Sequence, residues 1–583
     1  MQLRQRQRHR PRMFSAHDIN SRHRQADKLV SHDQQGRHHG GSRTLLDYVK
    51  YEAGGDGLNV TWDHNVNSRY ALERALSGAL NGVSAIVEGD VFLKRQSGYT
   101  PMMLIPPLAS DALKFKDWLS DISQSDKTVK INLKTTEVIK PALQYLFTVK
   151  DSFKGPLILH SNIGIMPGSL EVPVDAGVFT AEMRHAVPEA TIGVGWADGI
   201  MPIPDEDSVP VLTKYTWRII FNMLEYTYEL RQPILFSCRA LYATYSIYEL
   251  LWLLSVRENY AVNIFGAEKE SINDWAGIVA LRMYGPRDRI IYDFTPMQRQ
   301  AFIENWERMQ EIDLEPSLFD QSAWRVVQFI NPTALLSTIV VGSRGAAFLG
   351  WPTAFLLSHV HARPGRTQTV TGRLLFVRKD SYQRTNAAEE CGLAIFLLDS
   401  IDDIPSPIIR GGIRAFMGST GRVSLQNRVE KRSQHRHRHK HHNGTSSKME
   451  DLGAAPYAYI SPSRSEGPLT ASRLPPHECY GFRLVDEQRR IRLTVFVTRC
   501  AGGIQPFPKT SWSRTIALNV PRPESGRSRY VVIQKTGDAS VDMFVENLYH
   551  RNSAAAPVGD WWQRLVTFLV LLTLSKLYQA IQR

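Results

Sequence analysis

The most constraining feature of this sequence is a regular alternation of strand-like and helix-like segments from residue 56 to about residue 310. Short apolar runs typical of buried parallel strands lie at 58–62, 85–92, 129–133, 157–160, 191–194, 234–238, 261–265 and 289–292. Segments with apolar residues every three or four positions lie between them, at 70–80, 135–150, 217–230, 247–256 and 297–309 among others. Eight such units in about 250 residues predict a (β/α)8 TIM-type barrel. An open doubly wound sheet is the alternative, although no Gly-rich phosphate loop follows any of the strands.

The rest of the 583-residue chain lacks this alternation of strand-like and helix-like segments. Apolar runs without helical periodicity predict an all-β, sandwich-like domain of about eight strands at 318–418 and 474–548. A low-complexity insert rich in His, Arg and Ser is expected at 419–473, and a disordered basic segment at 1–55. The insert has histidines at 435, 437, 439, 441 and 442, which suit either a solvated loop or a metal chelator.

The hydrophobic C-terminal tail, residues 549–583, ends in a short apolar helix-like run at 565–574. Ten residues are fewer than the roughly 20 that span a bilayer. The alternatives are a transmembrane segment with snorkelling flanks, a lipid-anchor signal and a helix packed on the β-domain. Association with a membrane through this tail is the prediction, with release of the protein on deletion of 557–583 as its test.

The net charge of +13 lies outside the predicted domains. Residues 1–43 carry +7 and residues 422–442 carry +6, so the remainder is neutral. Nucleic-acid-binding domains usually carry their basic residues on the folded surface. We therefore expect no nucleic-acid partner.

Two features favour an extracellular or cell-surface location. Cys479 and Cys500 flank a predicted hairpin that turns near residues 486–489, which predicts a disulfide between them. Asn59 and Asn443 begin glycosylation sequons. The basic N-terminal residues lack the apolar region of a signal peptide. The extracellular or cell-surface location is expected despite the absence of this signal.

Polar side chains recur at the carboxyl ends of the predicted strands, where barrels of this type carry their active sites. Glu88 and Asp90 are two apart on one strand, so both point to the same face. A histidine after one strand and paired carboxylates on the next can form a metal-assisted acid–base site. The strand ends carry His64, Asn67, Glu88, Asp90, Asn132, Lys134, His160, Asn162, Trp196, Arg239, Glu268 and Asp293.

The segments TWDHNVNS, VEGDV, KINLK, VPVDA and GVGW, with the Pro-Pro that follows TPMML, resemble the menorin-domain family over roughly residues 56–305. QPILFSCRA and YAVNIFGAEKESINDWAGI resemble it further along the chain. That domain is similar to the glycerophosphodiester phosphodiesterase barrels, which are metal-dependent hydrolases.

The resemblance implies a role for several of these residues. His64 would be one acid–base group, Glu88, Asp90 and Asn132 would hold one Mg²⁺ or Ca²⁺ ion, and Lys134 and Arg239 would face a phosphate. Asn67, Asn162 and Trp196 would complete the mouth of the barrel. Ile105 stands where the second acid–base histidine would fall, and the neutral Asn132 replaces the third metal-binding acid.

Losing one acid–base partner typically lowers a rate about 10²–10⁴-fold. The expected function is therefore that of a menorin-like binding or adhesion cue with a phosphodiesterase-like barrel, acting on a cell-surface or extracellular protein partner, as in the patterning of neuronal processes. The alternative is an active metal-dependent phosphodiesterase of glycerophosphodiester-like substrates.

Overall fold

The computed structural model of the chain describes residues 44–77, 85–94, 100–105, 108–198, 214–268, 270–312, 314, 317–329, 337–360, 366–379, 391–401, 409, 411–419, 421–430, 449–454, 458–459, 478–499, 513–521 and 529–553. The chain divides into two compact units. Of the described residues, the N-terminal unit contains those from 44 to 317 and 341–344, and the C-terminal unit contains 318–340 and those from 345 to 553.

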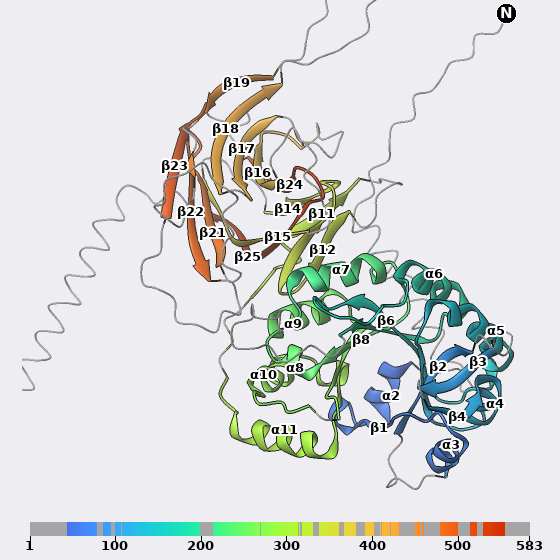
Figure 1. Ribbon diagram of the computed structural model, residues 1–583. Coiled ribbons are helices and arrows are strands. Elements are labelled where there is room, and N and C mark those ends of the chain that lie inside the picture. The colour runs from blue at the N-terminus through green and yellow to red at the C-terminus, as the bar shows by residue number, and fades with distance from the viewer. Residues whose placement is uncertain are drawn as a thin grey trace, which may run out of the picture. The chain divides into compact units, whose positions relative to one another are not determined.

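The N-terminal unit is built on one ten-stranded mixed sheet (Figure 1). Eight of its strands are parallel neighbours: β1 (Thr61–Asp63), β2 (Ala85–Lys94), β5 (Thr128–Leu133), β6 (Leu157–Ile165), β7 (Thr191–Ala197), β8 (Ile234–Arg239), β9 (Tyr260–Phe265) and β10 (Ile290–Asp293). The other two strands are β3 (Thr100–Ile105) and β4 (Leu108–Lys114). β3 pairs antiparallel with the second half of β2, and β4 pairs antiparallel with β3.

Helices alternate with these strands and cover the outside of the sheet in Figure 1. They are α3 (Arg69–Leu76), α4 (Phe115–Ile122), α5 (Ile139–Val149), α6 (Ala176–Ala186), α7 (Trp217–Thr227), α8 (Ala240–Ala243), α9 (Ile247–Val256), α10 (Ala276–Tyr284) and α11 (Pro296–Arg308), with short 3₁₀ turns η1 (Gly57–Asn59), η3 (Thr136–Val138), η4 (Lys150–Ser152) and η5 (Arg287–Arg289). Side chains of Ser68, Asp175 and Thr295 cap α3, α6 and α11.

One helix, α2 (Leu45–Tyr51), lies inside the curve of the sheet (Figure 1). Its buried residues Leu45, Tyr48 and Val49 form one cluster with side chains of five strands: Ile86, Ile158, Leu235, Ala261 and Ile291. We call the face of the sheet that packs on α2 the inner face. Residues 44–55 were expected to be disordered, and that expectation is wrong for them, because this short apolar stripe is buried by the strands.

The prediction of a closed (β/α)8 barrel is wrong. The sheet is mixed, and its hydrogen-bonded path runs from β10 to β4, with β1 paired to β2 off this path. Within the residues that the structure describes, no ladder joins β1 to β10. The residues before β1 form the 3₁₀ turn η1 instead of extending the strand. This turn packs closely on β10, because a Cβ atom at Gly57 would come 2.0 Å from the carbonyl oxygen of Ile290.

The C-terminal unit has two antiparallel sheets, of eight and seven strands, so the predicted number of about eight strands is too low. The eight-stranded sheet contains β11 (Trp324–Gln328), β14 (Ala354–Ser358), β24 (Tyr530–Thr536), β16 (Gly392–Leu398), β17 (Gly412–Gly418), β18 (Arg422–Glu430), β19 (Met449–Ala454) and β20 (Ala458–Tyr459). The seven-stranded sheet contains β12 (Thr338–Gly342), β13 (Gly345–Leu349), β25 (Val541–Ser553), β15 (Thr367–Arg378), β21 (Glu478–Asp486), β22 (Arg490–Arg499) and β23 (Ser513–Asn519).

The boundaries predicted for the low-complexity insert and for the C-terminal tail differ from those in the structure. The strands β18, β19 and β20 lie inside the predicted insert at 419–473, and β25 continues to Ser553, into the predicted tail. The histidines at 435–442 and the apolar run at 565–574 lie outside the described residues, so the C-terminal helix stays a prediction. Among the helices that are described, none is long and apolar enough to cross a membrane.

The predicted hairpin is present. Strands β21 and β22 pair antiparallel around residues 487–489, with Cys479 opposite Thr498. Cys500 lies just outside the described residues, and so does Asn443. The disulfide and the glycosylation of Asn443 therefore stay predictions.

Candidate functional site

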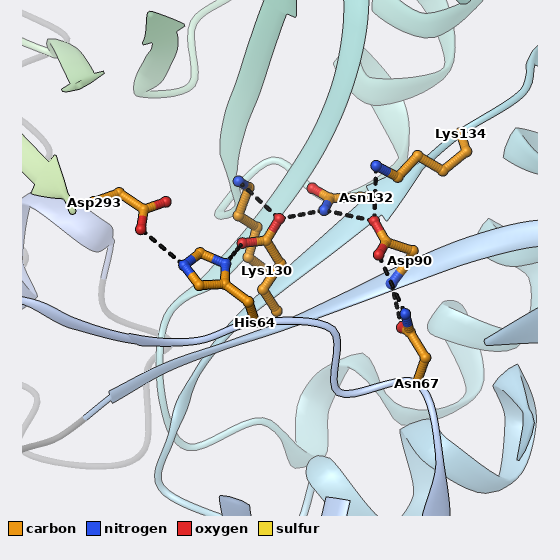
Figure 2. Close-up of polar contacts among 8 residues, drawn as sticks. His64, Asn67, Asp90, Lys130, Asn132, Lys134 and Asp293 are labelled. Atoms are coloured by element: carbon orange, nitrogen blue, oxygen red, sulfur yellow. Dashed lines mark hydrogen bonds and ion pairs between the residues drawn. The ribbon is translucent and has the colours of Figure 1, made fainter. Parts of the chain in front are cut away.

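His64 follows the first parallel strand, β1, and lies between the carboxylates of Glu88 on β2 and of Asp293, the last residue of β10 (Figure 2). Its Nδ1 is 2.7 Å from Glu88 Oε2, and its Nε2 is 2.8 Å from Asp293 Oδ1. The residue follows β1 directly, and Asn65 after it adopts a left-handed backbone with φ of 55°, which asparagine tolerates better than most residues. The imidazole also stacks parallel to the ring of Trp62.

The two carboxylates make His64 a cation. Burial alone would lower the pKa of His64, but the hydrogen bonds to Asp293 and Glu88 and the charges of both carboxylates raise it to about 10. Burial would likewise raise the pKa of Glu88, but the charge of Lys130 and the hydrogen bond from His64 hold it well below its usual range. His64 is therefore a doubly ion-paired imidazolium at neutral pH.

Asn132 connects Glu88 to a third carboxylate, that of Asp90. Its Nδ2 donates to Glu88 Oε1 and, at 3.0 Å, to Asp90 Oδ1. Asp90 also accepts from Lys134 Nζ at 2.8 Å and from Asn67 Nδ2 at 3.2 Å, while its backbone N–H donates to Asn67 Oδ1. The structure thus brings His64, Asn67, Glu88, Asp90, Asn132 and Lys134 into one network, which Figure 2 shows with Lys130 and Asp293.

Two cations neutralise the paired carboxylates. Lys130 Nζ lies 3.2 Å from Glu88 Oε1 and 5.4 Å from the centre of the Trp62 ring. The charge of Asp90 raises the pKa of Lys134, although burial opposes the rise. The cluster therefore holds three acids and three positive groups, which balance one another.

The donor atoms of this cluster fit a divalent cation. Ligand atoms of His64, Glu88 and Asp293 all lie within 4.8 Å of one another. Asn132 Oδ1 is buried and has no hydrogen-bond partner among the described residues. Carboxylate and amide oxygens are the ligands that Mg²⁺ and Ca²⁺ prefer.

The remaining predicted residues lie in other surroundings. Arg239 donates from Nε to Glu270 and from a terminal nitrogen to Asp198, both at 2.9 Å. Within the described part of the chain it has no hydrogen bond or ion pair with the cluster around His64. Trp196 is buried against Tyr215, with ring centres 4.8 Å apart. The backbone carbonyl of Asn162 accepts from Val174 N.

Two further residues were singled out in the sequence. Asn59 is exposed, and its side chain donates to the Ala53 carbonyl. Ile105 ends β3, and its side chain lies outside the described residues.

Two residues of the cluster have no role predicted from the sequence. They are Asp293, at the end of β10, and Lys130, inside β5. Asp293 has the same spacing from a buried isoleucine as Glu88. Glu88 comes two residues after Ile86, and Asp293 comes two residues after Ile291. Both isoleucines pack on α2. Lys130 carries no such signal, because a lysine inside a strand usually points to solvent.

Comparison with known proteins places the chain in a family. The model of the menorin N-terminal domain matches residues 56–299, and that of the menorin C-terminal domain matches 324–453 and 466–550. The human protein FAM151B is 26% identical over 251 residues, which is 42% of this chain and 86% of that relative.

Among solved structures, the exoplasmic/lumenal domain of VIP36 in its Ca²⁺/Man3GlcNAc-bound form is 10% identical, with 43% of this chain and 94% of that chain covered and a TM-score of 0.24. The metal-free carbohydrate recognition domain of Emp46p is 11% identical, with 41% and 96% covered and a TM-score of 0.22. These likenesses are too weak to carry an argument. The two family models together match most of the chain, and the chain belongs to the menorin family.

Proposed function

We propose that the charged cluster around His64 binds a phosphodiester group and that the chain works mainly as a binding protein. The observation that carries this proposal is the double ion pair of His64 with Glu88 and Asp293. A general base must be neutral to accept a proton, and an imidazolium held by two carboxylates is not. Lys134, which is partly exposed beside Asp90, is the cation best placed to meet an incoming phosphate.

The same cluster is proposed to hold one divalent metal ion, Mg²⁺ or Ca²⁺. Glu88, Asp90 and Asn132 would be its ligands, with Asp293 close by. The Asn132 amide, whose Nδ2 donates to both carboxylates in this structure, would turn to present Oδ1 to the ion. A bound ion would supply positive charge for a phosphate oxygen. The role of the chain's own residues would be to orient the phosphate and to balance its charge.

The proposal extends to the setting in which the protein acts. We place it outside the cell or at the cell surface, associated with a membrane through its C-terminal tail, where it binds a protein partner as an adhesion cue in the patterning of neuronal processes. The exposed sequon residue Asn59 and the hairpin that carries Cys479 support an oxidising, secretory environment.

A metal-dependent phosphodiesterase acting on glycerophosphodiester-like substrates is the second candidate. It is favoured by the proximity of imidazole and carboxylate ligand atoms in the His64, Glu88 and Asp293 group. Such a set resembles the ligands of catalytic metal centres more than those of a purely structural site.

The test combines metal titration with assays of hydrolysis and cell binding. Glu88→Gln should lower Mg²⁺ or Ca²⁺ affinity about tenfold or more, measured by calorimetry, because it removes a ligand charge. Glu73→Gln, on the exposed side of α3, is the matched control and should change nothing. Both variants should bind partner-bearing cells as the wild type does. Robust wild-type phosphodiester hydrolysis that His64→Ala abolishes would instead put the phosphodiesterase first.

A further inference from the structure

The inner face carries a second group of polar side chains, opposite in character to the charged cluster. His160, Ser237 and Asn263 are uncharged residues with exposed fractions of 8%, 5% and 1%. The atoms His160 Nε2, Ser237 Oγ and Asn263 Oδ1 are buried and have no hydrogen-bond partner among the described residues. A buried polar atom without a partner is costly, so three on one face require an explanation.

These three residues occupy the same layer as the charged cluster. On five strands, the residue that packs on α2 is followed two positions later by a polar one, and side chains two apart share a face. The five polar residues are Glu88, His160, Ser237, Asn263 and Asp293. Ser237 is the register partner of Asn263 on the adjacent strand, and His160 is the partner of Asn132. The layer therefore has a charged arc, Glu88 and Asp293, which both bind His64. It also has a neutral arc, His160, Ser237 and Asn263, whose buried polar atoms have no hydrogen-bond partner among the described residues.

Two glycines of β7 leave space for the neutral arc. A Cβ atom at Gly193 would lie 2.8 Å from His160 Cδ2, and one at Gly195 would lie 3.2 Å from His160 Nε2 and 2.4 Å from Asn162 Oδ1. Side chains at these positions would press on the imidazole. The two glycines therefore leave room beside His160 Nε2.

We propose that His160, Ser237 and Asn263 form a subsite for a polyhydroxylated, uncharged group attached to the phosphate. A hydroxyl both donates and accepts, so it can satisfy Asn263 Oδ1, which only accepts, together with the Ser237 hydroxyl and either state of the His160 nitrogen. A charged group would find no counter-charge among these three side chains. This inference rests on the proposed phosphodiester site, because that site fixes the other end of the ligand.

The experiment compares two phosphodiesters on the full chain by calorimetry. Glycerophosphoinositol carries hydroxyls on both sides of the phosphate, and dimethyl phosphate carries none. Ser237→Ala and Asn263→Ser should each weaken glycerophosphoinositol binding about five- to tenfold, the effect of one lost neutral hydrogen bond. Both variants should bind dimethyl phosphate as the wild type does.

Ser161→Ala is the matched control. Ser161 is also a buried serine of the same sheet, one residue after His160 on β6, and its hydroxyl donates to the Leu133 carbonyl. It should leave both affinities unchanged. Equal affinities of wild type and Ser237→Ala for glycerophosphoinositol would mean that ordered water alone occupies the neutral arc, and the inference would fall.

A third measurement separates failure of this inference from failure of the proposed function. Thermal shifts with free myo-inositol need no phosphate, and the wild type should gain more than Ser237→Ala and Asn263→Ser at equal concentration. A selective gain without binding of dimethyl phosphate would retain the subsite and reject the phosphodiester site. Binding of dimethyl phosphate without any selectivity for inositol or glycerophosphoinositol would do the reverse.

Discussion

At the scale of single residues, His64 gives the N-terminal unit a defined dependence on pH. Its pKa in the folded chain is about 10, above the usual value of 6.5, so its proton stabilises the folded state fully below pH 6.5. That contribution decreases as pH rises and is lost above about pH 10. Removing the imidazole should therefore cost most stability at low pH.

The prediction can be measured with His64→Gln in metal-free buffer containing a chelator. The difference in urea midpoint between wild type and variant should shrink steadily from pH 6.5 to pH 10. Asn67→Ala provides a control, because its amide contacts Asp90 and does not titrate. A difference that stays constant over this range would show that the imidazole is neutral in the folded protein.

At the scale of elements, the alternating sequence pattern predicted the eight parallel strands and the convergence of His64, Glu88, Asp90 and Lys134. It could not predict that the described parts of β1 and β10 are not paired. The 3₁₀ turn at Gly57 lies close to the backbone of Ile290, which is more than 200 residues away in the sequence. The pattern also missed the β3–β4 hairpin, since Pro101 and the Pro-Pro at 106–107 argue against strands when read locally.

The helix α2 was missed for a different reason. It has seven residues and follows a long polar segment, so composition averaged over a window hides it. A local signal was nevertheless present: Thr44 and Asp47 form a reciprocal capping box, with the Asp47 side chain accepting from the backbone of Thr44.

Packing of α2 should contribute measurably to the stability of the N-terminal unit. Leu45 is fully buried among strand side chains, so Leu45→Ala should lower the free energy of unfolding by about 2–5 kcal/mol. Tyr51, on the same helix, is 66% exposed, and Tyr51→Ala should change it by less than about 0.5 kcal/mol. Chemical denaturation of both variants tests the expectation. Equal effects would mean that α2 adds little to the core.

At the scale of the whole molecule, the C-terminal unit contains a buried network with the opposite pH behaviour. Ser358 on β14 donates to His550 Nδ1 at 2.6 Å, and His550 Nε2 donates to Gln368 at 3.1 Å. Gln368 in turn donates to Asp486, which also accepts from Arg529. Because β14 and β25 belong to different sheets, these bonds connect the two sheets of this unit.

Burial lowers the pKa of His550 to about 4. The unfolded chain takes up a proton near pH 6.5 and the folded chain does so only near pH 4. Stability of the C-terminal unit should therefore fall between these values, by about 3 kcal/mol from this residue alone. The two units should respond in opposite directions, the N-terminal one losing the His64 contribution on the alkaline side and the C-terminal one losing stability on the acid side.

Calorimetry of the full chain tests this difference. We expect two unfolding transitions, one that moves to lower temperature from pH 6.5 toward pH 4 and another that moves down toward pH 10. His550→Gln should weaken the acid dependence of the first transition and leave the second unchanged, because a glutamine does not titrate. His64→Gln should do the converse. A single transition would show that the two units unfold as one cooperative body. Two transitions that move together in both variants would show that neither histidine controls its own unit.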